Sequence, residues 1–390
     1  MLTIKKVPTV VSNYQEENSE RNLEGCGRNC LGNCCLPGSN LPLYSFKKDT
    51  EKSIENGMVR SSQDRQQAQI CFLHNLLLGQ WEDRMTRGLF RYDVTTCQST
   101  IIPGRYGFIA QLNEGRHLKK RPTEFRVDKV SPIEYGHVLL IPRILDCLPQ
   151  RIDSESFLLA VYLAKEASDP FFRVGYNSLG AFATINHLHF QAYYLAVSFP
   201  VEKAPTKRIT LKGTRDKGVV VSRLLNYPVK GLVFEGGNTI EDLSDSVSSS
   251  CIYLQNNNVP FNVLIADCGN RIFLFPQCYA EKQALGEVSQ ELLNTQVNPA
   301  VWEVSGHIVL KRRKDFEDAS EAYIWRLLAE VSVSEERFQE VTTRVLEAAG
   351  FEEVKKFFMW NQMGDQLNWS NNGHRLEAFI LILFLLLKRV

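Results

Sequence analysis

Two histidines and a glutamine occupy every second position of the segment His187-Leu188-His189-Phe190-Gln191. In a β-strand successive side chains point to opposite faces, so the three polar groups would share one face with Leu188 and Phe190 packed behind them. Imidazole is a competent nucleophile near neutrality, and a second imidazole and an amide can hold phosphoryl oxygens. The pattern favours attack on a phosphate, although histidines on strands are more often ordinary half-buried polar residues.

Several nearby elements are needed to position this row. The apolar run at residues 136–142 ends in proline and predicts a strand. Residues 175–180 predict a turn that leads into the histidine strand, and residues 157–167 predict a helix with Asp153 or Ser154 as its N-cap. We also expect strands at 108–112 and 125–127, a hairpin at 261–276, helices at 62–89, 320–331 and 334–349, and a serine-rich surface loop at 241–250.

The segment that begins Gly306-His307 echoes the one that begins Gly136-His137. This short repeat predicts an α+β fold of two related halves, each with an antiparallel sheet packed by helices. We expect a polar, mobile N-terminal arm at residues 1–60, a catalytic half at 61–235, a second half at 236–350 and a divergent tail at 351–390.

Composition excludes several classes of function. With 390 residues and 44% hydrophobic content the chain can bury a substantial core, and its net charge of +1 gives no overall attraction to nucleic acid or anionic membrane. The apolar run Ala378 to Leu387 is well short of the roughly twenty residues of a spanning helix, so we expect no membrane span. No signal peptide is evident, so we expect a cytosolic protein, with an additional nuclear location left open, and reduced thiols for its ten cysteines.

The cysteine cluster has unsuitable spacing for a structural metal site. Cys26, Cys30, Cys34 and Cys35 lack the usual C-x2-C pairs, and no histidine lies nearby to complete a zinc set. The chain also lacks the glycine-rich motifs of P-loop and dinucleotide-binding proteins. We therefore expect neither a metal nor another cofactor, while lipidation or a redox role for these cysteines stays open.

The order of these motifs resembles the histidine-triad superfamily. Its members share a Gly-His-apolar strand that ends in proline, an Asn-containing turn and a strand with alternating histidines; Gln191 at the third position resembles the transferase branch, which includes galactose-1-phosphate uridylyltransferase. Residues 175–195, 199–205 and 302–307 resemble the plant GDP-L-galactose phosphorylases of the ascorbate pathway. The likeness runs from Met1 to about Ala349, and the sequence after Phe351 does not share it.

The resemblance implies that phosphate cleaves GDP-L-galactose to GDP and L-galactose 1-phosphate. His189 would attack the α-phosphorus and carry the guanylyl group, with His187 orienting it and Gln191 donating its amide to a non-bridging oxygen. Asn177 and Thr184 lie where the family contacts phosphate, and Gly180 would let the backbone approach the ligand, although the Asn-Ser-Leu-Gly segment could serve only as a turn. Splitting the displacement into two steps on one nucleophile predicts ping-pong kinetics.

A basic cluster follows the expected strand at 108–112. Arg116 and Lys119 are candidates to neutralise the diphosphate or the incoming phosphate, whereas a run of charge is usually a solvated face.

Other functions stay open on the residues alone. The sugar could be glucose, as in GDP-glucose phosphorylase, the acceptor could be water, as in a nucleotide hydrolase, or the chain could be a nucleotide-binding regulator without turnover. Gln191 argues against the hydrolase and the intact histidine pair against the regulator. We expect GDP-hexose and inorganic phosphate as partners, no nucleic acid, and no identifiable protein partner.

Overall fold

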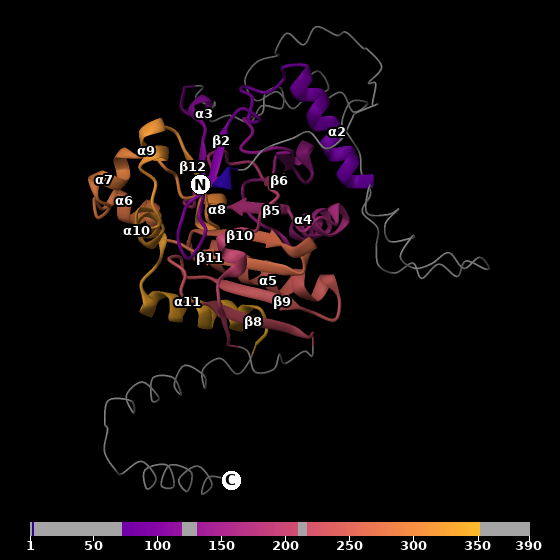
Figure 1. Cartoon of the computed structure of the whole chain (residues 1–390). Coiled ribbons are helices and arrows are strands. Elements are labelled where there is room, and N and C mark those ends of the chain that lie inside the picture. Colours follow the sequence, from indigo (N-terminus) through magenta and orange to yellow (C-terminus); the bar gives the residue numbers. More distant parts are fainter. Residues whose placement is uncertain (1, 4–71, 119–130, 210–216, 352–390) are drawn as a thin grey trace, which may run out of the picture.

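The computed structural model describes residues 2–3, 72–118, 131–209 and 217–351 (Figure 1). Its strands form an eight-stranded sheet in the order β4-β6-β5-β10-β11-β9-β8-β7 and a four-stranded sheet in the order β1-β2-β3-β12. Every pair in the larger sheet is antiparallel, whereas β12 runs parallel to β3 in the smaller one. The predicted α+β class, with antiparallel sheets packed by helices, is confirmed.

The bounds of the elements are as follows. The strands are β1 (Leu2–Thr3), β2 (Gln98–Ile101), β3 (Ile109–Leu112), β4 (Val138–Leu140), β5 (Phe172–Asn177), β6 (Phe190–Tyr194), β7 (Thr206–Arg208), β8 (Val219–Leu224), β9 (Leu232–Gly236), β10 (Phe261–Ala266), β11 (Arg271–Pro276) and β12 (His307–Leu310). The α-helices are α2 (Phe72–Thr86), α3 (Glu114–Leu118), α4 (Ser154–Ala167), α5 (Ile240–Asn256), α6 (Tyr279–Ala284), α7 (Gln290–Asn294), α8 (Val301–Val304), α9 (Arg313–Glu317), α10 (Glu321–Val331) and α11 (Glu335–Ala348). Short 3-10 helices are η1 (Ile144–Asp146), η2 (Pro200–Lys203) and η3 (Asp267–Gly269).

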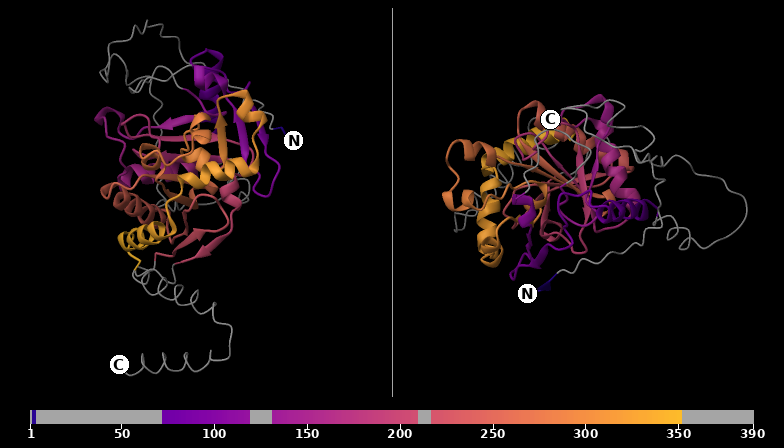
Figure 2. Two further views of the ribbon diagram at one scale, coloured as in Figure 1. Left: turned by 90° about the vertical axis from the view of Figure 1, so that its left-hand side faces the viewer. Right: turned by 90° about the horizontal axis from the view of Figure 1, so that it is seen from above.

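Alternation along the strands of the larger sheet creates two cores. On β11, Ile272 and Leu274 belong to one core, which α2, α4, α5 and α11 cover, while Phe273 and Phe275 belong to the other. This second core lies against α8, α10 and the four-stranded sheet. In Figure 2 the orange helices α6, α7 and α10 and the indigo helix α2 lie at opposite ends of the molecule. The two faces of one sheet therefore carry separate apolar layers.

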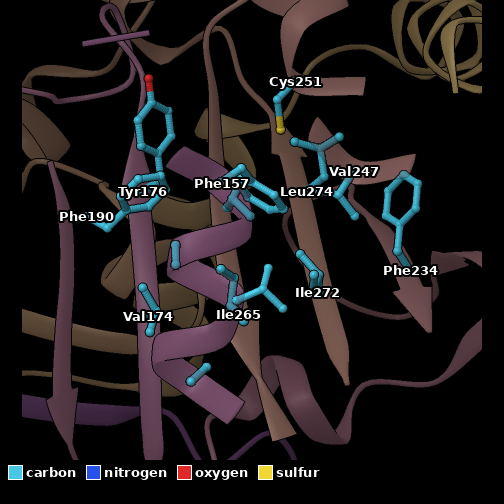
Figure 3. Packing of buried hydrophobic residues seen from close by; sticks show 14 of the residues in the cluster. Phe157, Val174, Tyr176, Phe190, Phe234, Val247, Cys251, Ile265, Ile272 and Leu274 are labelled. Atoms are coloured by element: carbon cyan, nitrogen blue, oxygen red, sulfur yellow. The ribbon is translucent and has the colours of Figure 1, made fainter. Parts of the chain in front are cut away.

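Figure 3 shows the first core, where α4 crosses the larger sheet. Phe157 of α4 points toward Tyr176 of β5 and Phe190 of β6, and its ring centroid lies 6.4 Å from that of Phe190. Asp153 caps the helix, because its side chain accepts a hydrogen bond from the backbone N–H of Ser156 at 2.9 Å. The predicted position and N-cap of α4 are confirmed, and the helix packs against one face of β5 and β6.

The histidine row does not lie within a strand. β6 begins at Phe190, so His187 lies in a bend and His189 in the irregular segment directly before the strand. The reason is that the pairing on both sides of β6 ends here, because β4 ends at Leu140, the partner of Phe190, and the pairing with β5 ends at Gly175, the partner of Gln191. Leu188 nevertheless joins Phe190 in the first core, so the predicted apolar back of the row is confirmed.

Two other predictions of local structure were wrong. Residues 175–177 are the end of β5, and the turn begins only after Asn177. Residues 241–250 lie in helix α5, where a surface loop was expected. Thr239 caps α5 by accepting from the backbone N–H of Asp242, and the hydroxyls of Ser246 and Ser250 donate to carbonyls four residues earlier. Because the serines bond within their own helix, they can be buried against the sheet.

The two predicted halves do not have separate sheets. β10 pairs with β5 through partners such as Val263 and Tyr176, so strands from both sides of residue 236 form one continuous sheet. The two Gly-His segments also differ in setting, because one enters β4 at the edge of the larger sheet and the other enters β12 in the smaller sheet. Shared sequence at these places therefore does not reflect shared strand pairing.

Other predicted elements are confirmed where the structure describes them. They are the strands at 108–112 and 136–142, the hairpin of β10 and β11, and the helices at 320–331 and 334–349, for which Ser320 and Ser334 are the N-caps. Helix α2 covers the described part of the one expected at 62–89. The strand expected at 125–127, the cysteine cluster, nearly all of the N-terminal arm and the apolar tail lie outside the described residues.

Candidate active site

His189 has its ring proton on Nδ1. Its Nδ1 lies 2.7 Å from the backbone oxygen of His187, and a carbonyl oxygen can only accept, so Nδ1–H is the donor. In the neutral ring this tautomer leaves the lone pair on Nε2. The side chain is buried, with 8% of its surface exposed. His189 thus has the tautomer that a nucleophilic Nε2 requires.

A glutamine side chain holds the backbone of His189, with which no strand pairs. The Oε1 of Gln150 accepts from the backbone N–H of His189 at 3.0 Å, and its Nε2 donates to the carbonyl of His189 at 3.2 Å. The same Nε2 donates to the carbonyl of Asn177 at 2.9 Å. The buried amide of Gln150 therefore replaces a strand neighbour and links the segment before β6 to the end of β5.

Gln191 has its amide oriented by a tryptophan. The indole Nε1–H of Trp302 donates to Oε1 of Gln191 at 3.2 Å, across 111 residues of sequence. An indole nitrogen is only a donor, so the amide oxygen must face Trp302 and the amide NH2 must point elsewhere. The ring of Trp302 packs against that of Tyr193, two residues further along β6, with 4.2 Å between centroids and 46° between the ring planes. This packing fixes the donor side of Gln191.

Gly175 leaves the space in which Trp302 lies. It is the strand partner of Gln191. A Cβ at this position would lie 2.7 Å from Cγ1 of Val301 and 3.0 Å from two ring carbons of Trp302. Because such approaches are too close for carbon atoms, any larger residue would push α8 away from the sheet.

Asn177 connects three segments of the chain. Its Oδ1 accepts from Nδ2 of Asn262 at 2.7 Å and from the backbone N–H of Val301 at 2.8 Å. With its oxygen used in this way, the amide nitrogen is the group that Asn177 can offer to a ligand. The residue therefore ties β5 to β10 and α8 and also lines the cavity described next.

A cavity of about 450 Å³ opens between the larger sheet and the smaller one. Of the predicted substrate-binding residues, Asn177, Thr184 and Arg116 line it, together with Gln191. The other lining residues are Ser131, Ile133, Phe182, Gln296, Asn298, Ala300, Trp302, Glu303, Val309 and Lys311. His187 and His189 are outside this lining set, and His189 is two residues from Gln191 in the sequence.

Three of the described lining residues carry charged side chains. Burial raises the pKa of Glu303 to about 7, although the charges of Arg116 and Lys311 act to lower it. Burial and the neighbouring charge of Arg116 lower the pKa of Lys311, while Glu303 opposes that shift. Glu303 also accepts from the backbone N–H of Ala300 at 3.2 Å. Two cations thus share the cavity with one partly neutralised carboxyl group.

Comparison with known proteins identifies the family. The family model described as "GDPGP1-like, N-terminal domain" matches residues 72–131 and 129–193, and the one described as "GDPGP1-like, C-terminal domain" matches residues 200–352. The chain belongs to the GDPGP1-like family.

Relatives in this family act, by name, on GDP-hexoses. The chain is 59% identical to GDP-L-galactose phosphorylase 1 of Arabidopsis thaliana over 90% of both chains, and 57% identical to GDP-L-galactose phosphorylase 2 over 90% of this chain and 91% of that one. It is 28% identical to human GDP-D-glucose phosphorylase 1, over 71% of this chain and 84% of that one. Among solved structures, yeast Ap4A phosphorylase Apa2 matches 67% of this chain and 96% of its own at 13% identity, with a TM-score of 0.47.

Both GDPGP1-like domains contribute to the cavity. Gln191 and Asn177 lie in the part matched by the N-terminal domain, whereas Trp302, Glu303 and Lys311 lie in the part matched by the C-terminal domain. The sequence analysis did not single out these three as site residues. Trp302 and Glu303 stand in a segment that resembled the plant phosphorylases, and this was the one signal that could have pointed to them.

The remaining predicted residues have different surroundings. Gly180 is exposed at a φ of +79°, and a Cβ there would lie 3.1 Å from Pro260, so its place reflects the turn. His187 is buried, with 5% of its surface exposed, and its carbonyl orients His189. His137 accepts from the backbone N–H of Ile133 at 2.8 Å, as a structural histidine would. Lys119 lies outside the described residues.

The described residues contain neither a candidate metal site nor a candidate membrane span. No group of three or more histidine, cysteine, aspartate or glutamate side chains in them is arranged to hold a metal ion. None of their helices combines the length and the apolar character that crossing a membrane requires.

Proposed function

We propose that this chain is a GDP-L-galactose phosphorylase that forms a guanylyl-histidine on His189. The identity of 59% and 57% to the two Arabidopsis thaliana enzymes, over nine-tenths of the chain, carries the choice of substrate. The lower identity of 28% to human GDP-D-glucose phosphorylase 1 makes GDP-D-glucose the second candidate. L-galactose 1-phosphate would then supply the synthesis of L-ascorbate.

The reaction runs in two displacements at one phosphorus atom. Nε2 of His189 bonds to the α-phosphorus while the bond to the bridging oxygen breaks, and L-galactose 1-phosphate leaves with that electron pair. An oxygen of inorganic phosphate then bonds to the same phosphorus, the N–P bond breaks, and GDP leaves. The Nδ1–H tautomer of His189 supports this role, because its hydrogen bond to the carbonyl of His187 would stabilise the positive ring during transfer.

Gln191 supports transfer to phosphate. Its NH2 group, turned away from Trp302, would donate to a non-bridging oxygen and offset charge as the phosphorus becomes five-coordinate. A neutral amide can act neither as a general acid nor as a general base. Water would need a base to become a nucleophile, whereas inorganic phosphate is already an anion and attacks without one. The orientation of Gln191 therefore fits phosphorolysis better than hydrolysis.

The test is to incubate the protein with GDP-L-galactose, first without phosphate and then with it. We expect a stoichiometric release of L-galactose 1-phosphate and an adduct with the mass of guanylate on the peptide that contains His189. Added phosphate should discharge the adduct as GDP. In parallel, GDP-D-glucose reports the sugar preference, and GMP formed in the absence of phosphate reports hydrolysis.

The variant His189→Asn removes the nucleophile but keeps an amide that can donate to the carbonyl of His187. It should lose on the order of 10⁴-fold or more in turnover while binding GDP as the wild type does. Near-normal phosphorolysis by this variant, or an unmodified peptide while product forms, would show that His189 does not carry the guanylyl group.

A further inference from the structure

Two positive side chains face the cavity from elements other than the strands that carry Gln191 and Asn177. Arg116 is on α3, and Lys311 directly follows β12, so both belong to the side of the cavity formed by the smaller sheet. Gln191 and Asn177 lie on β6 and β5 of the larger sheet. A ligand in the cavity would therefore meet amide donors on one wall and cations on the other.

The positive charges of Arg116 and Lys311 are only partly balanced by Glu303. Among the described residues of the lining, Glu303 is the acidic one, and with its pKa raised to about 7 by burial it is only partly ionised near neutrality. Burial and the charge of Arg116 both make the protonated form of Lys311 less favourable. Lys311 also donates to the backbone oxygen of Gln296, which holds its ammonium group in place. An anion bound between the two cations would neutralise this excess positive charge and favour the protonated form of Lys311.

The chemistry of in-line transfer defines which anion belongs there. In each displacement the entering and leaving groups lie on opposite sides of the phosphorus. Because His189 occupies one side in both steps, the leaving sugar phosphate and the incoming inorganic phosphate must occupy the same position on the other side. One anion subsite is therefore needed beyond the α-phosphate, and it is used twice in each turnover.

We propose that Lys311 and Arg116 form this subsite, which holds the β-phosphate of the GDP-hexose and then inorganic phosphate. The inference rests on the proposed function for the identity of the ligands. It adds a binding residue, Lys311, that follows the second Gly-His segment, and it assigns Arg116 to the second phosphoryl group.

The test compares the binding of GDP with that of GMP, which lacks the second phosphate. We expect the wild-type protein to bind GDP more tightly than GMP in titration calorimetry. Lys311→Met should weaken the binding of GDP by about tenfold to a hundredfold and that of GMP by less than about twofold. The KM for inorganic phosphate should rise by a similar factor, and Lys311→Arg, which keeps the charge, should recover much of the loss.

Lys314→Met is the matched control, because Lys314 is exposed on α9 only three positions away. It should leave both affinities and the KM for phosphate unchanged. Equal weakening of GMP and GDP by Lys311→Met, no weakening of either, or equal affinity of the wild type for both nucleotides would overturn the subsite. The comparison of GDP and GMP affinities requires neither a sugar nor turnover. Its result is therefore separate from a failure of the proposed function, which would appear as hydrolysis or as inactivity with GDP-L-galactose.

Discussion

At the scale of single residues, the groups of the candidate site are each oriented by a hydrogen bond, which for Gln191 and Asn177 comes from a residue far away in sequence. Trp302 orients Gln191, the backbone of His187 orients His189, and Asn262 orients Asn177. Each bond engages the acceptor or donor that the proposed chemistry does not need, and leaves the other for a ligand. Such preorganisation lowers the cost of reorganising polar groups when charge develops on a phosphoryl group.

Glu303 allows a prediction about stability and pH. Its pKa of about 7 in the folded protein is above its ordinary value of 4.5, so the folded state holds this proton more tightly than the unfolded state. The stabilisation is complete below pH 4.5 and is lost as the pH rises through 7. Glu303→Gln, which resembles the protonated acid, should therefore be more stable than the wild type by about 3 kcal/mol at pH 8.5 and nearly equal to it at pH 4.5.

Chemical denaturation of both proteins across this pH range measures the difference. The difference in unfolding free energy between the two proteins should grow as the pH rises, because ionisation of a buried carboxyl group destabilises the folded wild type. A difference in unfolding free energy that stays constant from pH 4.5 to pH 8.5 would contradict a raised pKa for Glu303.

At the scale of elements, local patterns in the sequence predicted what local interactions determine. The cap of α4 at Asp153, the hairpin of β10 and β11 and the caps of α10 and α11 each depend on residues close together in the chain. Helix α5 was missed because its serines resemble those of a loop, while Leu243, Val247 and Cys251 recur at helical spacing beneath them. The limits of β6 depend on where β4 ends, which the sequence of β6 does not contain.

The site was predictable only in part for the same reason. The alternation of His187, His189 and Gln191 is visible in a few adjacent residues, whereas Lys311 and Trp302 reach the cavity through the pairing of distant strands. The roles of the predicted site residues stay predictions until variants are measured.

The contact between β5 and α8 gives a prediction at the element scale. Gly175→Ala would place its Cβ against Val301 and Trp302, displace α8 and release the amide of Gln191. We expect a loss of about 1–3 kcal/mol in stability and of roughly tenfold in kcat/KM with GDP-L-galactose. Adding Val301→Ala removes the closest contact and should restore part of both.

Gly231→Ala is the matched control for crowding alone. A Cβ at Gly231 would lie 2.8 Å from Phe275 and 3.0 Å from Leu224, yet Gly231 is outside the cavity lining. This variant should lose comparable stability and keep kcat/KM. If both glycine variants lose activity in proportion to stability, Gly175 has no specific effect on Gln191.

At the scale of the whole molecule, the two family domains share one sheet and both cores. β10 pairs with β5 over four residues on each strand, from Asn262 with Asn177 to Ile265 with Val174. The first core joins Val174 of one domain to Leu274 of the other. A cavity that needs residues from both domains is thus built on a framework that neither domain completes alone, and the two should unfold together.

This cooperativity gives the last prediction. Leu274→Ala deletes buried apolar volume in β11 and should lower the free energy of unfolding by about 2–4 kcal/mol. If the domains unfold as one unit, native-state hydrogen exchange of the amides in β5 and β6 should report the same decrease as the amides in β10 and β11. Leu285→Ala, at a leucine that is 65% exposed, should change neither set. A decrease confined to β10 and β11 would mean that the C-terminal domain opens by itself, and the cavity would then be assembled by docking of two independent units.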